Sequence, residues 1–325
     1  LFIKLMTICP LPDLELEKLL KILRSTILLH VLDLGDATPE LLRVQSALAL
    51  QCFINEYIYN YSTKEKKALG ALEGIVRKSL KNNQQPSPQA ILALASYKPL
   101  NQYDWCNLLV TTDDIKDVFT CQVEEHKKEE EIKSHFPILG EITDGVSSKV
   151  REQYEESPYP RWVNLGLSFE PEPIPKVLRR LRIRFSNNTI NFEKTPSILI
   201  AGCGTGQHSI DTAARFKSSN LLAIDLSLAS LAYAKRKTDE FSIKNIEYMQ
   251  ADILDLGQLN KQFDLIESMG VLHHMDNPMA GWEVLKNCLK PGGLMKIGLY
   301  SELARRDIVK IREEILQLGL GSSST

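Results

Sequence analysis

The stretch SILIAGCGTGQH, residues 197–208, decides the fold of this 325-residue chain. A short apolar run is followed by glycines at three alternate positions, Gly202, Gly204 and Gly206, and then by a helix-compatible segment. This order predicts a buried strand, a tight turn and the start of a helix. Glycine lets the backbone approach a ligand closely, and the free N–H groups of a helix start face the same point. The sequence therefore predicts a site for a nucleoside-bearing ligand at this turn.

Further apolar runs follow the glycine turn, and each ends near a polar residue. Residues 221–224 lead to Asp225, 246–251 to Asp252 and 263–267 to Ser268. Asp225 follows the glycines at about the spacing at which an acidic residue binds a ribose hydroxyl pair. Because helix-compatible segments separate the runs, we predict an α/β fold with a parallel sheet covered on both faces. Ligands of such sheets bind beyond the carboxyl ends of the strands, where these polar residues lie.

Five motifs in this order resemble class I S-adenosylmethionine-dependent methyltransferases. They are the glycine turn, Asp225, Ala251-Asp252-Ile253, the segment FDLIESMGVLHHMDNP (263–278) and the turn LKPGGL (289–294). The resemblance covers about residues 197–300. It implies a Rossmann-like, mostly parallel sheet with strand order 3-2-1-4-5, S-adenosyl-L-methionine as the cofactor, and methyl transfer to an acceptor that the motifs do not identify. The family sheet has two further strands that nothing after Tyr300 could form, so we expect a chain that ends early.

The resemblance also implies which residues bind the cofactor. The set comprises Gly202, Cys203, Gly204, Gly206, Asp225, Leu226, Asp252, Ile253, Ser268 and Met269. In this family the glycines line the methionine part, the first acidic residue accepts the ribose hydroxyls, the second meets the adenine, and the last two residues lie beside the sulfonium. The sequence departs from the family pattern at Ile200, where a carboxylate often precedes the glycines. The amino group of the cofactor must then be held by other groups.

The segment VREQYEESPYPRW, residues 150–162, is expected to cover the cofactor. Two prolines end a helix and fix an extended turn. The segment resembles the stretch before the domain in bacterial methyltransferases that carry tetratricopeptide-type helices and a Tyr-Glu-x-x-Pro-Tyr-Pro-Arg-Trp signature. That resemblance implies Tyr154, Tyr159 and Arg161 as lid residues, with Arg161 pairing with the methionine carboxylate. The alternative is that these side chains pack the helical module onto the sheet.

Catalysis depends on what the acceptor needs. A sulfonium-bound methyl group is already activated, so the enzyme mainly aligns the reactants and removes water. A general base is needed only if the acceptor must lose a proton. The candidate catalytic residues are Glu267, at the end of a strand, and His274, with His273 beside it. The alternative for the histidines is a turn-capping and packing role. No metal site is predicted.

The first part of the chain reads as successive helices. Thr38-Pro39, Ser62 and Ser87-Pro88 are predicted helix starts, because Ser and Thr cap helices and proline suits their first position. We predict an α-helical module at 1–135, a connecting and lid segment at 136–190, and a C-terminally truncated methyltransferase domain at 191–325. No 34-residue repeat is found, although the helices resemble helical-repeat hairpins. The module is a candidate surface for a protein partner.

The composition of the chain indicates which classes of binding partner are favoured. With 39 basic and 41 acidic residues, the net charge of −2 favours neither nucleic acid nor an anionic membrane. The basic segment 176–185 is interpreted as a solvated helix face. No apolar run is long enough for a membrane span, and six scattered cysteines without a Cys-x-x-Cys motif favour reduced thiols in the cytoplasm. We therefore expect a cytoplasmic enzyme acting on a small molecule or a protein.

Two other function classes stay open. A nicotinamide-dependent reductase shares the glycine turn and both acidic residues, but its turn usually carries a later glycine where Gln207 stands here. Tyr233 and Lys237 match the reductase Tyr-x-x-x-Lys spacing, yet they follow Asp225, the wrong place for that catalysis. The other class is a non-catalytic scaffold. The intact glycines, Asp225 and Asp252 disfavour it, and the expected early end favours it.

Overall fold

The chain divides into two compact units in the computed structural model. The described residues are 1–33, 37–167, 170–181, 193–301 and 303–319. One unit comprises Leu1–Ser134 and Pro160–Gly166, and the other comprises His135–Tyr159 and Leu167–Thr325. The segment predicted as a connection, 136–190, is therefore divided between the two units instead of forming a separate part.

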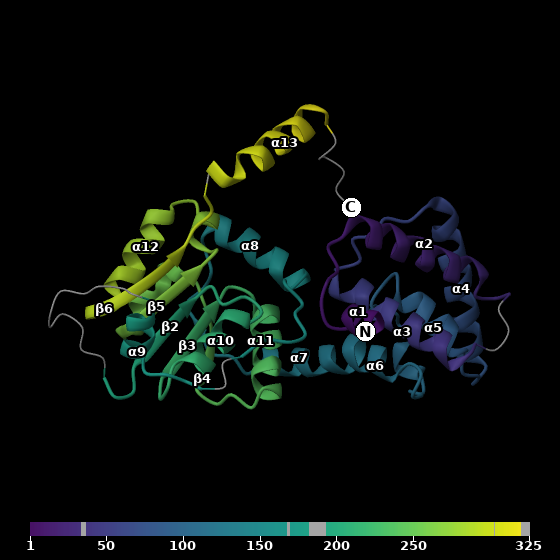
Figure 1. The fold of residues 1–325 in the computed structure, drawn as a ribbon, viewed down its shortest axis with the longest axis horizontal. Coiled ribbons are helices and arrows are strands. Elements are labelled where there is room, and N and C mark those ends of the chain that lie inside the picture. The colour runs from purple at the N-terminus through teal and green to yellow at the C-terminus, as the bar shows by residue number, and fades with distance from the viewer. Residues whose placement is uncertain (34–36, 168–169, 182–192, 302, 320–325) are drawn as a thin grey trace. The chain divides into compact units, whose positions relative to one another are not determined.

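The first unit is helical (Figure 1). Its helices are α1 (Phe2–Met6), α2 (Leu14–His30), α3 (Pro39–Ile54), α4 (Thr63–Lys81), α5 (Pro88–Ala95), η1 (Leu100–Gln102), η2 (Cys106–Leu108), α6 (Lys116–Phe119), the π-helical turn η3 (Thr120–Glu124) and α7 (Glu125–Lys133). The predicted starts of α3, α4 and α5 are confirmed, because the side chains of Thr38, Ser62 and Ser87 each accept a hydrogen bond from the first turn.

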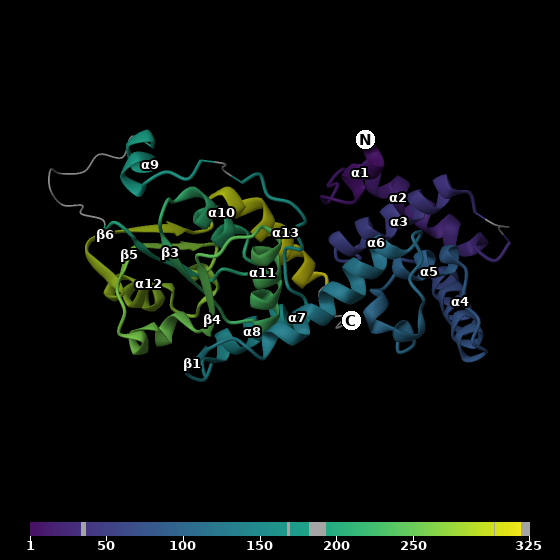
Figure 2. The same ribbon diagram turned by 90° about the horizontal axis from the view of Figure 1, so that it is seen from below.

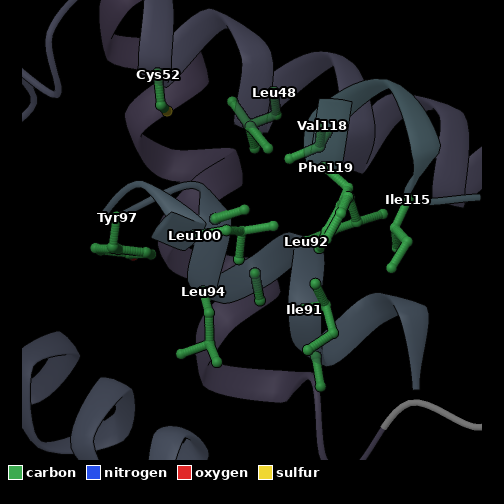
Figure 3. Close-up of a cluster of buried hydrophobic side chains, with 14 of the residues drawn as sticks. Leu48, Cys52, Ile91, Leu92, Leu94, Tyr97, Leu100, Ile115, Val118 and Phe119 are labelled. Atoms are coloured by element: carbon green, nitrogen blue, oxygen red, sulfur yellow. The ribbon is translucent and has the colours of Figure 1, made fainter. Parts of the chain in front are cut away.

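Helix α5 lies at the centre of this unit's core. Seven of its eight residues, Gln89–Ala95, are buried, and Ile91, Leu92 and Leu94 belong to the same cluster of buried side chains as Leu48 of α3 and Val118 of α6 (Figure 3). Burying one such aliphatic side chain contributes about 1.5–3 kcal/mol. The helical unit therefore has a hydrophobic core of its own.

The second unit contains a six-stranded sheet in which every pair of neighbouring strands is parallel. The strands are β1 (Ile138–Leu139), β2 (Ser197–Ala201), β3 (Asn220–Asp225), β4 (Ile246–Ala251), β5 (Phe263–Met269) and β6 (Leu289–Gly298), in the order β1-β4-β3-β2-β5-β6. The predicted order 3-2-1-4-5 corresponds to β4-β3-β2-β5-β6 and is confirmed. Strand β1 was not predicted; it extends one edge by pairing Ile138 with Gln250.

Helices cover both faces of the sheet (Figures 1 and 2). The elements of this unit are α8 (Gly145–Glu156), α9 (Ile174–Arg180), α10 (Gln207–Arg215), α11 (Leu228–Glu240), η4 (Ile253–Leu259), η5 (Leu272–His274), α12 (Pro278–Asn287), η6 (Leu303–Arg305) and α13 (Arg306–Gln317). Helices α10 and α11 pack against β3 and β4, whereas Leu285 of α12 joins a core with Leu199 and Ile266 on the other face. Two covered faces explain why β2 is a continuous apolar run.

Two other predictions concern surface segments and membranes. The basic segment predicted as a helix over 176–185 is helical in α9 as far as Arg180, and 182–192 lie outside the described residues. Within the part of the chain that the structure describes, no helix has both the length and the apolar character that crossing a bilayer requires.

Candidate functional site

The glycine turn joins β2 to α10, and its three glycines serve different purposes. A Cβ added at Gly202 would lie 2.3 Å from Cγ2 of Val271, and one added at Gly206 would lie 2.5 Å from Cβ of Ala234. These two positions exclude a side chain because of packing. At Gly204, by contrast, a Cβ would meet only the carbonyl oxygen of Tyr159, at 3.9 Å. Gly204 is therefore the position at which the turn leaves room for a ligand.

Asp225, at the end of β3, is hydrogen-bonded to this turn. Its Oδ2 accepts from the backbone N–H of Gly204 at 2.7 Å, and its Oδ1 accepts from the N–H of Ser227 at 3.0 Å. Burial raises the pKa of the Asp225 carboxyl above its usual value, although these backbone N–H groups act in the opposite direction. The carboxylate thus ties the tips of the neighbouring strands β2 and β3 together.

The residues beside these two groups are held by the backbone. The N–H groups of Gly202 and Cys203 both donate to the carbonyl oxygen of Ile224 at 2.9 Å. Burial raises the pKa of the Cys203 thiol well above its usual value, so this side chain is a small packing group and not a nucleophile. The carbonyl oxygen of Leu226 accepts from Nε2 of Gln250 at 2.7 Å, which connects the β3 tip to β4.

Asp252 and Ile253 lie at the end of β4, as predicted. Oδ1 of Asp252 accepts from the N–H of Leu254 at 3.0 Å and caps η4, and the Asp252 side chain is buried. Ile253 is also buried, in the core that lies under α12. The sheet therefore places Gly204, Asp225 and Asp252 at the ends of three neighbouring strands, β2, β3 and β4. Ends of neighbouring parallel strands share one edge of the sheet.

Ser268 and Met269 end β5 on the other side of β2. The Ser268 hydroxyl is buried and donates to the carbonyl oxygen of Ala201 at 3.0 Å, so it stabilises the β2–β5 pair. Met269 is partly exposed, and its side chain covers Gly298 of β6, where an added Cβ would lie 2.5 Å from the Met269 methyl carbon. Both residues thus lie at the predicted sheet edge, although the Ser268 side chain is used within the sheet.

Glu267 was predicted as a candidate base, and the structure gives it a different role. Its Oε2 accepts from Thr212 Oγ1 at 2.8 Å and lies 2.7 Å from His208 Nε2, while Lys296 Nζ lies 3.5 Å from Oε1. Burial alone would raise the pKa of Glu267, but His208, Lys296 and Thr212 outweigh it and lower the pKa to about 2. A carboxylate held in its ionised form by these partners is a poor proton acceptor at neutral pH.

The two histidines that follow β5 differ in their surroundings. His274, the predicted catalytic residue, is exposed, whereas His273 is partly buried and stacks on Tyr300 with 3.8 Å between the ring centroids. Burial, with the charges of His274 and Arg305, lowers the pKa of His273. Within the described residues neither ring nitrogen of His273 has a hydrogen-bond partner. A lowered pKa and ring nitrogens without a partner among the described residues make His273 a candidate proton acceptor.

The predicted lid residues fall into different units. Tyr154, in α8, belongs to the sheet unit; burial raises its pKa, and the charge of Asp225 adds to this effect. Tyr159 approaches Gly204 through its carbonyl oxygen, and its own side chain is exposed. Arg161 instead belongs to the helical unit, where its Nε lies 2.8 Å from Oε1 of Glu56 and its guanidinium stacks on Phe53. The charge of Arg161 is thus paired within the helical unit, and its role at the cofactor stays a prediction.

Comparison with known proteins agrees with this geometry. Residues 198–293 match the family described as a methyltransferase domain. An uncharacterised protein of Synechococcus, syc1184_c, is 31% identical over 196 residues, which are 57% of this chain and 45% of that protein. The ubiquinone biosynthesis O-methyltransferase of Acinetobacter baumannii strain AYE is 30% identical over 97 residues, 30% of this chain and 40% of that protein. The chain spans about half the length, or less, of the curated relatives it matches.

Among solved structures, PKMT2 from Rickettsia typhi in complex with AdoHcy is similar at 25% sequence identity. The match has a TM-score of 0.36 and covers 42% of this chain and 27% of that one.

The methyltransferase domain match, 198–293, contains the glycine turn, both acidic residues and the end of β5. It also contains Tyr233 and Lys237, which match the reductase Tyr-x-x-x-Lys spacing but follow Asp225. Tyr233 and Lys237 are buried in α11, and Lys237 Nζ donates to Glu240 Oε2 at 2.8 Å. Residues that the sequence analysis missed are Val271, which excludes a side chain at Gly202, and Glu155, beside Tyr154 in the lid signature. The signature itself was the available signal for Glu155.

Proposed function

We propose that this chain is an S-adenosylmethionine-dependent methyltransferase that acts on a small molecule or a protein. The observation that carries the proposal is the hydrogen bond from Gly204 N–H to the Asp225 carboxylate at the tips of β2 and β3. It lies inside the segment that matches a methyltransferase domain. Asp225 is the residue placed to accept ribose hydroxyls, and Asp252 lies at the next strand tip.

The residues present fit this cofactor. Gly204 leaves room where a side chain would otherwise project, and both Asp225 oxygens are acceptors at a half-buried position. The negative charge of this carboxylate contributes to the raised pKa of Tyr154. Ile200 is fully buried and cannot reach a ligand, so backbone carbonyl oxygens or another side chain would hold the amino group of the cofactor. When bound, S-adenosylmethionine supplies a methyl group on a positively charged sulfur.

The chain itself would supply alignment, exclusion of water and, for some acceptors, a base. Helix α8 and the β5 end would exclude water from the transfer, which needs in-line alignment more than covalent chemistry. His273 would accept a proton from an acceptor that must lose one, because its imidazole is neutral at pH 7. Glu267 would hold His208 and Lys296 in place and not act on the acceptor.

We also propose a class of methyl acceptor, a cellular location and a partner surface for this chain. The match to the ubiquinone biosynthesis O-methyltransferase spans 97 residues and 40% of that protein, so it does not carry its acceptor over to this chain. We expect a cytoplasmic enzyme without a nucleic-acid or membrane partner, because the charge is nearly balanced. The helical unit is the candidate surface for a protein partner.

Calorimetry with S-adenosylhomocysteine and with NADH tests the cofactor assignment. We expect S-adenosylhomocysteine to bind and NADH not to bind, and we expect Asp225→Asn to weaken binding about tenfold, because it removes a charged acceptor. Asp239→Asn is the matched control, since Asp239 is exposed and forms an ion pair with Lys235 within α11. Tight NADH binding without S-adenosylhomocysteine binding would favour the reductase. Transfer of a labelled methyl group into lysate fractions would separate an enzyme from a scaffold.

A further inference from the structure

We propose that Glu155 is a positioning residue, whose carboxylate fixes helix α8 to the first turn of α11 and thereby holds Tyr154 beside Asp225. The inference rests on the proposed function, because the site that Tyr154 helps to cover is the cofactor site. Glu155 was assigned no role from the sequence, although it stands in the lid signature next to Tyr154.

The hydrogen bonds at the start of α11 carry this inference. The N–H of Leu228 donates to Glu155 Oε1 at 2.5 Å, and the N–H of Ala229 donates to Oε2 at 3.2 Å. The next N–H, of Ser230, donates to the Ser227 side chain at 3.0 Å, and the helical ladder begins with Leu231. The first N–H groups of a helix have no partner within it. Of the first three N–H groups of α11, those of Leu228 and Ala229 therefore donate to the Glu155 side chain of α8.

The same turn is held by the cofactor-binding carboxylate. Ser227, the N-cap of α11, donates its backbone N–H to Asp225 Oδ1 at 3.0 Å. Asp225 thus holds the beginning of this turn from β3, and Glu155 holds its next two residues from α8. Because Tyr154 adjoins Glu155 in the chain, docking of this carboxylate fixes the part of α8 that carries Tyr154 against the turn that Asp225 holds.

Charge explains why a glutamate suits this position. The Glu155 carboxylate lies close enough to Asp225 to raise the pKa of the latter further, so the two charges repel each other. The positive end of the α11 dipole and its two N–H groups offset this repulsion. A glutamine offers one acceptor oxygen in place of two and carries no charge, so its hydrogen bonds to these two N–H groups are weaker. The neighbouring Glu156 is exposed and provides a matched control.

Binding of S-adenosylhomocysteine by the whole chain tests the role in the site. We expect Glu155→Ala to weaken binding about tenfold, Glu155→Gln to have a smaller effect, and Glu156→Ala to have none. In a Tyr154→Ala background, Glu155→Ala should add little, because both changes remove the same contact of the lid. Unchanged binding by Glu155→Ala, or effects that multiply in the double variant, would overturn the proposal.

Amide exchange tests the docking separately from the ligand. Leu228 and Ala229 should exchange faster in Glu155→Ala than in the unmodified chain, whereas amides of β2 should keep their rates and show that the fold is intact. Equal protection of Leu228 and Ala229 in both proteins would refute the docking. If the unmodified chain failed to bind S-adenosylhomocysteine while these amides responded, the proposed function would be wrong and the docking of α8 would stand.

Discussion

Single residues at the strand ends are fixed by close contacts, and Gly202 is the most restricted of them. Its φ of 77° is one that residues with a side chain rarely adopt, and an added Cβ would overlap both Cγ atoms of Val271. We therefore expect Gly202→Ala to reduce the free energy of unfolding by about 3 kcal/mol, through strain and overpacking together. Urea denaturation measures this loss.

Two further variants test whether the contact with Val271 causes this loss of stability. Gly257→Ala, in η4, is the control, because a Cβ there meets no atom within 4 Å and its φ is not left-handed; we expect a change within about 0.5 kcal/mol. Val271→Ala combined with Gly202→Ala should recover part of the loss, since it removes both clashing atoms. If the double variant were as unstable as the sum of the two single changes, the contact with Val271 would not be the cause.

The buried carboxylate of Glu267 predicts a pH-dependent contribution to stability. Its pKa is lowered from 4.5 to about 2, so the folded state binds this proton less readily than the unfolded state does. Its contribution is complete above pH 4.5 and is lost as the pH falls towards 2. Glu267→Gln should thus lower stability on the order of 3 kcal/mol at pH 7 and much less at pH 3.

Urea unfolding at both pH values checks this dependence. Glu247→Gln, an exposed change on β4, is the control and should alter stability little at either pH. An equal loss for Glu267→Gln at pH 7 and pH 3 would mean that packing, and not the charge beside His208 and Lys296, accounts for the effect.

At the scale of elements, the start of α4 shows how local sequence and packing combine. The Ser62 hydroxyl accepts from the N–H of Glu65, while Oε2 of Glu65 accepts from the N–H of Ser62 at 2.8 Å. Oε1 of the same carboxylate accepts from the Tyr97 hydroxyl at 2.8 Å, which links the box to the segment after α5. We expect Ser62→Ala to cost about 1 kcal/mol in urea unfolding.

The neighbouring Thr63→Ala is the control for this capping box. Thr63 is exposed at the first position of α4, and its side chain forms no part of the box, so its replacement should be close to neutral. Equal losses for Ser62→Ala and Thr63→Ala would mean that the box contributes nothing beyond helix propensity.

The elements also show what a sequence can and cannot predict. Helix caps and the glycine turn depend on residues close together in the chain, whereas the order of the five longer strands was implied by the family resemblance, and these predictions hold. Strand β1 has only two residues, too few for a recognisable alternation, and it forms because Gln250 pairs with it. Glu267 and Arg161 were assigned roles at the cofactor, but their partners, His208 with Lys296 and Glu56, come from other elements. Periodicity carries no information on such pairs.

At the scale of the molecule, the two units have separate cores. One core consists of residues between Met6 and Val123, and the sheet core under α12 consists of residues between Leu199 and Cys288. Since stability lost in one core need not weaken the other, local openings should be confined to one unit. We expect Ser62→Ala to speed amide exchange in α4 and α5 and to leave exchange in β2 and β3 unchanged. Gly202→Ala should speed amide exchange in β2 and β3 and leave exchange in α4 and α5 unchanged.

Hydrogen exchange read out by mass spectrometry over both units measures this separation. The comparison is internal, because each variant is the control for the other and both proteins are the whole chain. Faster exchange in both units for either variant would show that the units unfold as one cooperative structure, whatever their separate cores suggest. Exchange confined to the altered unit would instead mean that the helical unit can change its stability without changing the strand ends that hold Gly204 and Asp225.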